Sequence, residues 1–399
     1  MYNTRVTKPK IAFVMGSKFP TSKAYGVTTR ETLISLINST CEVKIFCHES
    51  DYFDEDFAKI LNIISNYKFN RFTSLLIRLG ERGANRFNQI SWLIGTTIDL
   101  LLNIRLITSF KPELIWTRDP IIAYICLKAF PNIRILLEVH SNGTKFIYKT
   151  LSNHKNKIYF FPINIINDNF LKSIKTDLKT SLAPMAIRSE HLATESQIEN
   201  LMLQINRKQK QNLRIGYIGN FAPQGYSKGI EDLIGLSKIC QLKSNNFEIT
   251  LIGCTDSEKK FYEMYQKKLN IKVEYLKFMT HLRHSEARIM MNKFDILVLP
   301  LPKDAKYTGM PLKLLEYLAA GRVTLVANSV ITTSVFQGEF KPYYYLPGDS
   351  MNLFDSIHSA ISDSQLKDNI CLGVEFASQF TWKLRTDKML SIALSMPNV

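Results

Sequence analysis

The sequence of 399 residues lacks several features that mark particular classes of protein. Its six cysteines form no Cys-x-x-Cys pair and follow no regular spacing, which argues against a disulfide framework and favours reduced thiols in the cytoplasm. No signal peptide is expected, because Lys8 and Lys10 lead directly into an apolar strand. The longest apolar stretch, Ile90–Ile107, contains Asp99 and Arg105, so we predict a buried helix there rather than a membrane span.

Acidic residues are scarce in one part of the chain. Residues 57–188 carry 19 basic and 7 acidic side chains, a net charge of +12 out of +16 for the whole sequence. Such a region suits nucleic acid, an anionic membrane surface or a phosphorylated substrate. The sequence contains no nucleic-acid-binding motif, no zinc spacing and no metal-ligand cluster, so neither nucleic acid nor a metal is an expected partner.

The segment Asn66–Gln89 mixes basic and apolar residues and contains one acid, Glu81. This composition predicts a helix at an anionic membrane interface or facing a lipid-linked acceptor. The alternative is an ordinary surface helix that packs its apolar side on the protein, and the sequence leaves both open. The basic residues of the segment are Lys68, Arg71, Arg78, Arg82 and Arg86.

Apolar strand-like runs alternate with helical patterns along the chain, which indicates parallel sheets. Because the chain is too long for one ordinary core, we predict an α/β protein of two doubly wound, Rossmann-like domains. The expected bounds are 1–200 and 201–375, followed by a C-terminal segment, 376–399. The strands expected are Ile11–Met15, Cys41–Cys47, Glu113–Arg118, Ile133–Val139, Leu182–Ile187, Leu213–Gly219, Phe247–Gly253, Ile271–Leu276, Asp295–Leu299 and Val323–Ala327.

Ligands of parallel sheets bind at the carboxyl ends of the strands, which identifies candidate residues in the first domain. Gly16 and Gly26 bound a predicted loop after the first strand, and Arg118 ends a later one. His140 follows a further strand and precedes a polar loop. A structural role remains the alternative for each of these residues.

The second domain begins with a predicted strand that ends at Gly219-Asn220, and Lys228 opens the next helix. Backbone N–H groups and an ammonium at such a helix start suit a diphosphate. Further along, Pro311 and Gly321 bound a short helix whose helical spacing places Lys313, Glu316 and Tyr317 away from the core. A solvated Glu316 paired with Lys313 is the simpler interpretation of that face.

The string from Gly309 to Ala327, Gly-x-Pro-x-Lys-x-x-Glu-Tyr-x-Ala-x-Gly-x-x-x-x-Val-Ala, resembles the donor-site segment of the GT-B glycosyltransferases, specifically family 4. The resemblance implies that Glu316 holds the nucleotide ribose and that Lys228 binds the donor diphosphate. It implies further that His140 has a catalytic role near the transferred sugar. By the same resemblance the two domains face each other across a cleft, and the helix 376–399 packs back towards the first domain. The remaining donor-binding residues it implies are Gly219, Asn220, Thr308, Gly309, Met310, Pro311 and Leu312, and it places Gly16, Gly26 and Arg118 on the acceptor side.

Two positions depart from the family pattern. Thr308 stands where the family has the first acid of its E-x7-E motif, and Asn220 stands where it usually has an arginine. Arg283 or Lys313 could supply the missing cation. The sequence thus predicts a retaining glycosyltransferase that uses a UDP- or GDP-linked sugar without a metal and acts on a glycan or lipid-linked acceptor. An inert GT-B partner subunit and a nucleotide-sugar epimerase are the alternatives.

Overall fold

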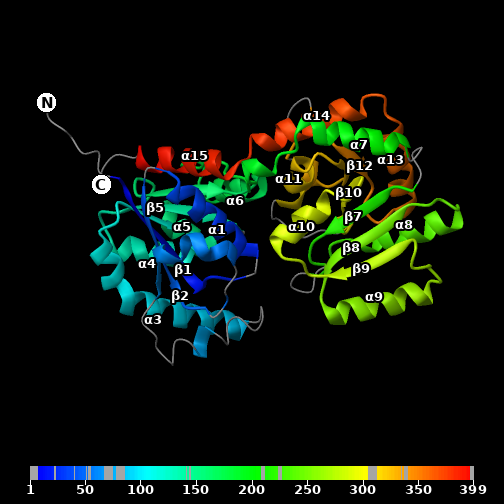
Figure 1. The fold of residues 1–399 in the computed structure, drawn as a ribbon. Helices are drawn as coiled ribbons and strands as arrows, with labels where there is room; N and C mark the ends of the chain where they lie inside the picture. The colour runs from blue at the N-terminus through cyan, green and yellow to red at the C-terminus, as the bar shows by residue number, and fades with distance from the viewer. Residues whose placement is uncertain are drawn as a thin grey trace. The chain divides into compact units, whose positions relative to one another are not determined.

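The chain forms two compact units, each a parallel sheet with helices on both faces (Figure 1). The first comprises Met1–Met185 and Trp382–Val399, and the second comprises Ala186–Thr381. The division falls at residue 185, whereas the sequence suggested 200. This computed structural model describes residues 8–21, 24–39, 41–50, 52, 55–66, 75–77, 86–140, 142, 145–207, 212–222, 227–303, 312–333, 335–336 and 340–395. Most of the predicted membrane segment at 66–89 lies outside those ranges.

The sheet of the first unit has the strand order β3-β2-β1-β4-β5-β6 with every pairing parallel. Its strands are β1 (Lys10–Lys18), β2 (Glu42–His48), β3 (Ile64–Asn66), β4 (Leu114–Thr117), β5 (Arg134–Val139) and β6 (Ile158–Pro162). Its helices are α1 (Ala24–Ile37), η1 (Glu55–Ile63), α3 (Arg86–Phe110), α4 (Pro120–Ala129), α5 (Lys145–Ser152), α6 (Ile165–Ile174) and α15 (Trp382–Leu394).

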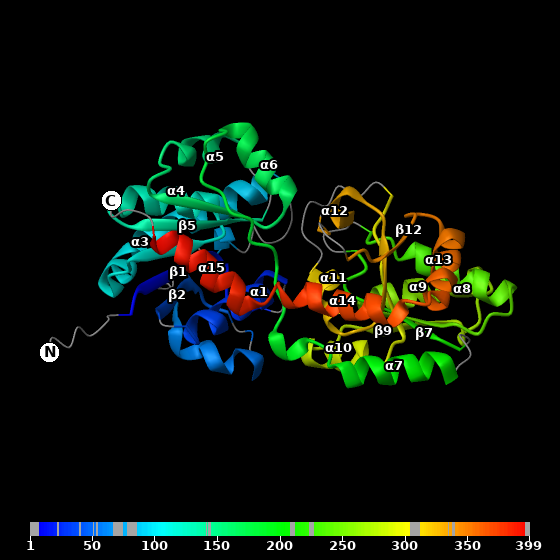
Figure 2. The ribbon, with the colours of Figure 1, turned by 90° about the horizontal axis from the view of Figure 1, so that it is seen from above.

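Alternating residues of these strands enter two separate cores, as the period of a strand requires. Ala12 and Val14 pack under α3, α4, α5 and α6, whereas Ile11 and Phe13 pack under α1, η1 and α15. Helix α15 lies beside α1 in this second layer, where Ser35 and Thr386 are hydrogen-bonded at 2.5 Å (Figure 2).

The second unit repeats the design with the strand order β12-β11-β10-β7-β8-β9. Its strands are β7 (Arg214–Ile218), β8 (Glu248–Cys254), β9 (Leu276–Thr280), β10 (Ile296–Leu299), β11 (Val323–Ala327) and β12 (Tyr343–Tyr345). Its helices are η2 (Ser189–His191), α7 (Glu195–Arg207), α8 (Glu231–Leu242), α9 (Asp256–Lys268), α10 (His284–Met291), α11 (Leu312–Ala319), α12 (Val330–Thr333), α13 (Ser350–Ser362) and α14 (Leu366–Ser378).

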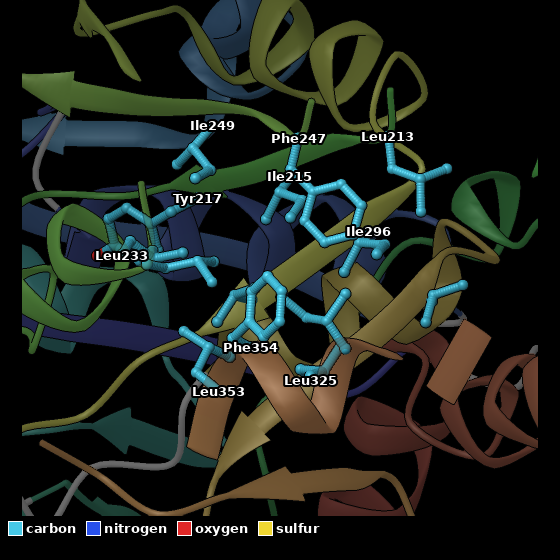
Figure 3. Packing of buried hydrophobic residues seen from close by; sticks show 14 of the residues in the cluster. Leu213, Ile215, Tyr217, Leu233, Phe247, Ile249, Ile296, Leu325, Leu353 and Phe354 are labelled. Carbon is cyan, nitrogen blue, oxygen red and sulfur yellow. The ribbon is translucent and has the colours of Figure 1, made fainter. Parts of the chain in front are cut away.

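One face of this sheet carries a large core of aliphatic and aromatic side chains (Figure 3). Ile215 and Tyr217 of β7 point into it beside Phe354 of α13. Helix α7 belongs to the same core through Ile198, Leu201 and Ile205, which recur at helical spacing. Helix α7 is therefore a layer of the second unit.

Three predicted elements were wrong in detail. Leu182–Ile187 forms no strand of the sheet, because Pro184 has no N–H and its carbonyl accepts a hydrogen bond from Arg385 Nε at 2.8 Å. The strand expected at Ile271–Leu276 begins only at Leu276, since residues 271–275 turn after α9. The single helix expected over 376–399 is parts of two helices, α14 and α15, that belong to different units.

Candidate active site

A buried carboxylate organises the carboxyl end of β5. Glu138 is fully buried and contacts four donors with its two oxygens. Oε1 accepts from Trp116 Nε1 at 2.6 Å and pairs with Arg118 Nε at 3.3 Å. Oε2 lies 2.7 Å from Arg385 Nη2 and 3.1 Å from His140 Nε2. One carboxylate thereby joins β4, β5, α15 and the predicted catalytic histidine.

These contacts determine which nitrogen of His140 carries the proton. Burial raises the pKa of Glu138, but Arg118 and Arg385 outweigh it and hold that pKa well below its ordinary value. The ionised carboxylate can only accept, so Nε2 of His140 must donate to it. Burial lowers the pKa of His140. A neutral His140 therefore presents Nδ1 as an acceptor, which suits a hydroxyl of a sugar or acceptor, the role that the sequence suggested.

Arg118 was predicted to contact the acceptor, but its guanidinium is directed to the protein. Nη1 donates to Thr28 Oγ1 at 2.9 Å and to Thr29 Oγ1 at 2.8 Å, and Nη2 donates to Thr32 Oγ1 at 3.1 Å. With Nε against Glu138, Arg118 fixes α1 and that carboxylate together. The geometry supports a positioning role.

The predicted loop between Gly16 and Gly26 is shorter than expected, because Gly16 lies in β1 and Gly26 in α1. A Cβ at Gly26 would lie 2.2 Å from the Thr21 carbonyl oxygen, and one at Gly16 would lie 2.5 Å from Thr96 Cγ2. Both glycines allow close packing of a helix at this end of β1.

In the second unit, α11 carries the predicted ribose ligand. Glu316 Oε2 pairs with Lys313 Nζ at 2.8 Å, and Oε1 lies 3.2 Å from His284 Nε2. Burial raises the pKa of Glu316, but Lys313 and His284 bring it down to about 2. The carboxylate is therefore ionised and held in one place.

The prediction that Glu316 and Tyr317 face away from the core was wrong, since they are only 6% and 0% exposed. Helix α11 is short and enclosed, with α10 and α14 packed against it. The Tyr317 hydroxyl accepts from Ile218 N at 2.9 Å and so fixes the end of β7 against α11.

Lys228 lies in a closely held turn before α8. Its N–H donates to Phe221 O at 2.9 Å, and Ser227 Oγ donates to the Glu231 carboxylate at 2.8 Å. Gly229 has φ +77°, and a Cβ there would lie 2.6 Å from the Leu301 carbonyl carbon. The side chain of Lys228 is half-buried, and burial lowers its pKa. The turn after β7 and the turn after β10 thus meet at this lysine.

Gly219 and Asn220 occupy the turn after β7. Gly219 N donates to Ile252 O at 2.8 Å, and a Cβ at Gly253 would lie 2.4 Å from the Gly219 carbonyl oxygen, so only small residues fit. Both residues suggested as substitutes for the missing arginine already pair with a glutamate in the structure. Lys313 pairs with Glu316, and Arg283 pairs with Glu286 at 3.4 Å. Leu312 begins α11, whereas Thr308, Gly309, Met310 and Pro311 lie outside the described residues.

Several residues of the site gave no signal in the sequence. His191 and Arg288 line the recess beside Glu316 together with His284, and its volume of about 10 Å³ holds one water at most. Burial, with Arg288 and His284 nearby, lowers the pKa of His191 to about 4. These residues come from η2 and α10, far from Glu316 in sequence. Glu138, by contrast, was detectable, because it lies two residues before His140 and so shares its face of the strand.

A larger recess of 640 Å³ lies elsewhere in the second unit. It is lined by Arg214, Glu248 and Lys277 at the amino ends of β7, β8 and β9, and by Met290 and Phe294. The donor-site residues lie at the carboxyl ends of the strands, where parallel sheets bind ligands. The recess is therefore not the predicted nucleotide site.

Residues 212–363 match the family described as "Glycosyl transferases group 1". Sucrose-phosphate synthase from Thermosynechococcus elongatus superposes with a TM-score of 0.70 at 15% identity, covering 96% of this chain and 98% of that one. Anabaena HepE in complex with UDP and glucose gives 0.65 at 13% identity, with 97% and 100% covered. The lipopolysaccharide outer core galactosyltransferase WaaB gives 0.61 at 14% identity, with 96% and 99% covered.

No protein with a curated description matches the chain by sequence. At these identities the structural matches show the fold, two Rossmann-like units as in GT-B enzymes. The family match lies in the second unit and includes Lys228, Leu312 and Glu316. Together these findings show a GT-B fold whose second unit matches a glycosyl transferase family.

Proposed function

We propose that this protein is a retaining hexosyltransferase of glycosyltransferase family 4, which moves a sugar from a UDP- or GDP-linked donor to an acceptor hydroxyl. The observation that carries the proposal is the ionised Glu316, held by Lys313 and His284 on α11 within the segment that matches the glycosyl transferases. A fixed carboxylate of this kind accepts hydrogen bonds from the two ribose hydroxyls. Its own partners position it before the nucleotide arrives.

The chemical difficulty of the reaction is departure of the nucleoside diphosphate while positive charge develops at the anomeric carbon. Cations and N–H dipoles fixed in advance stabilise that departure. Lys228, half-buried in its rigid turn, is the residue proposed to receive the leaving charge. The neutral His140 accepts a hydrogen bond from the sugar or the acceptor at Nδ1, and Glu138 keeps it in that tautomer.

The acceptor is proposed to be a lipid-linked intermediate of a cell-surface polysaccharide, used at the cytoplasmic face of the plasma membrane. The support for this is the net charge of +12 over residues 57–188, which suits a phosphorylated lipid.

The first test is the thermal stability of the pure protein with UDP, GDP and ADP. A nucleotide at about 100 times its dissociation constant adds roughly 2.7 kcal/mol of stability. We expect one of the uridine or guanosine nucleotides to raise the Tm, and Glu316→Ala to abolish that rise by weakening binding about 100-fold or more, since two hydrogen bonds to a charged group are lost.

Glu286→Ala is the matched control. Glu286 lies on the neighbouring α10 and, among the described residues, contacts the exposed Arg283 at the start of that helix. It should keep the full nucleotide response. If no nucleotide stabilises the wild type, the donor-site proposal fails and the alternative of a catalytically inert subunit is favoured. If one does but no donor is turned over with any acceptor fraction, the protein binds nucleotide without transfer.

Transfer is also proposed to need no metal ion, because Lys228 provides the positive charge at the diphosphate. We expect the rate of transfer to be unchanged, within about twofold, after dialysis against EDTA. Recovery of a lost activity by added Mg²⁺ or Mn²⁺ would assign the leaving charge to a metal instead.

A further inference from the structure

Helix α3 buries several polar residues and exposes several large apolar ones. Its buried face includes Ser91, Thr96, Asp99 and Asn103, which are all at most 5% exposed. Its outer face carries large apolar side chains that are 44–67% exposed. These are Phe87, Ile90, Ile94, Leu101 and Leu102. Surface helices of globular proteins show the reverse pattern, so the outer face of α3 is suited to an apolar medium.

The outer apolar residues form one stripe. Phe87, Ile90, Ile94 and Leu101 are spaced by three, four and seven residues, which places them on one side of the helix over about 21 Å. By length and composition Ile90–Phe110 could cross a membrane. Leu100 and Ile107 of α3 nevertheless belong to the core of the first unit, so α3 lies on the protein with its stripe outward.

The two helices that continue this layer add basic and aromatic residues. Helix α4 lies in contact with both α3 and α5, and all three cover the same core. Lys128 of α4 is exposed and lies over the ring of Tyr124, with Nζ 5.9 Å from its centroid. Helix α5 exposes Lys145, Lys149 and Phe146, the last at 76%.

Carboxylates are almost absent from these helices. Asp99 is the single acidic residue in α3, α4 and α5, and it is buried against His48 at 3.0 Å. The exposed Glu113 lies beyond the end of α3 and accepts from Lys10 N at 3.3 Å. Helix α9 of the second unit also exposes apolar residues, but it carries Asp256, Glu258 and Glu263. The α3–α4–α5 face is thus both apolar and cationic.

We propose that the α3–α4–α5 face binds an anionic lipid bilayer, with α3 in the plane of the membrane and its stripe in the interface. This proposal rests on the proposed function for the identity of the acceptor. It adds that the first unit lies at the membrane surface, where a lipid-linked acceptor is found. In-plane helices bind in this way when apolar area and basic residues act together. A second copy of the chain fits less well, because it would bring Arg105, Lys128 and Lys149 against the same cations. Nucleic acid would leave the aliphatic stripe in water.

The test is co-sedimentation of the full chain, without donor, with vesicles of phosphatidylcholine mixed with phosphatidylglycerol. We expect binding to these vesicles and at least tenfold weaker binding to pure phosphatidylcholine. Replacing both Lys128 and Lys149 with glutamine should weaken binding about 25-fold, since each basic residue contributes roughly fivefold. Raising the salt from about 0.1 M to about 1 M should release the protein, because the Debye length falls from about 10 Å to about 3 Å.

The stripe is tested with the pair Leu101→Ser and Leu102→Ser, which should weaken vesicle binding more than tenfold. The matched control is Leu203→Ser with Leu242→Ser, two leucines of the second unit that are 53% and 71% exposed. Equal binding of both double variants would overturn the proposal. So would sedimentation velocity showing a dimer that the Leu101 and Leu102 changes dissociate, or a short RNA duplex that displaces the vesicles. The nucleotide thermal shift in solution should be the same in all these variants, so failure here is distinguishable from failure of the donor site.

Discussion

Replacing Glu138 with alanine is expected to lower the free energy of unfolding of the first unit by about 3–5 kcal/mol. The carboxylate is fully buried and lies between Arg118 and Arg385, so its removal leaves two buried guanidinium groups without a counter-charge. It also removes the acceptor of Trp116 Nε1. The destabilisation affects β4, β5 and α15 at once, because Trp116 lies in β4, Glu138 in β5 and Arg385 in α15.

Thermal unfolding measures the effect. For a domain of 150–250 residues, such a loss lowers the Tm by roughly 6–20 °C. Glu113→Ala, at an exposed glutamate directly before β4, is the control and should shift the Tm by less than about 2 °C. A Glu138 variant as stable as this control would show that the two arginines find other partners.

Replacing Glu138 with glutamine changes how stability depends on pH. The folded pKa of Glu138 lies well below its unfolded value of about 4.3, so the ionised carboxylate stabilises the fold above pH 4.3 and that contribution is lost as the pH falls below it. The stability difference between wild type and Glu138→Gln should therefore shrink on acidification below about pH 4.3. His140 affects stability at higher pH, because burial lowers its pKa below the unfolded value of about 6.5. The stability that the neutral imidazole contributes is therefore lost as the pH falls below about 6.5.

The residues whose signals are local were predicted most accurately from the sequence. The strand Val323–Ala327 has the predicted bounds, because a mainly apolar run begins two residues after Gly321, just beyond the end of α11. The two-unit α/β fold followed from the same alternation of strands and helices. A solvated Glu316 paired with Lys313 was the alternative interpretation of that face, and the structure contains the pair but buries the carboxylate.

What failed depends on tertiary packing. Helical periodicity assigned Tyr317 to the outer face, but α11 is covered on several sides, so a buried hydroxyl there binds the backbone of Ile218. The sequence suggested a buried helix around Ile90–Ile107, yet only one face of α3 is buried, and the other exposes apolar residues such as Ile94 and Leu101. The contact of Arg385 with Glu138 joins residues 247 positions apart, and no short pattern records it.

Replacing Lys228 with methionine is expected to lower kcat by about 10²–10³, the usual loss when one preorganised group that stabilises developing charge is removed. Methionine keeps the volume of the side chain and removes the charge. Phe221, Ser227 and Gly229 hold the turn through its backbone, so the fold should tolerate the change. Lys260→Met, at an exposed lysine of α9, is the control and should retain wild-type kcat.

The pH dependence of kcat/KM gives the sharper test of the same residue. Burial lowers the pKa of Lys228, so in the free enzyme its charge is lost at a lower pH than that of an ordinary lysine. Because kcat/KM follows the ionisation of the free enzyme, it should fall on the alkaline side with a pKa below about 10.4. Lys228→Arg, which stays protonated throughout, should keep measurable activity and lose that alkaline fall. An unchanged alkaline fall in Lys228→Arg would assign it to another group, and a Lys228→Met enzyme within about threefold of wild type would show that the leaving diphosphate is stabilised elsewhere.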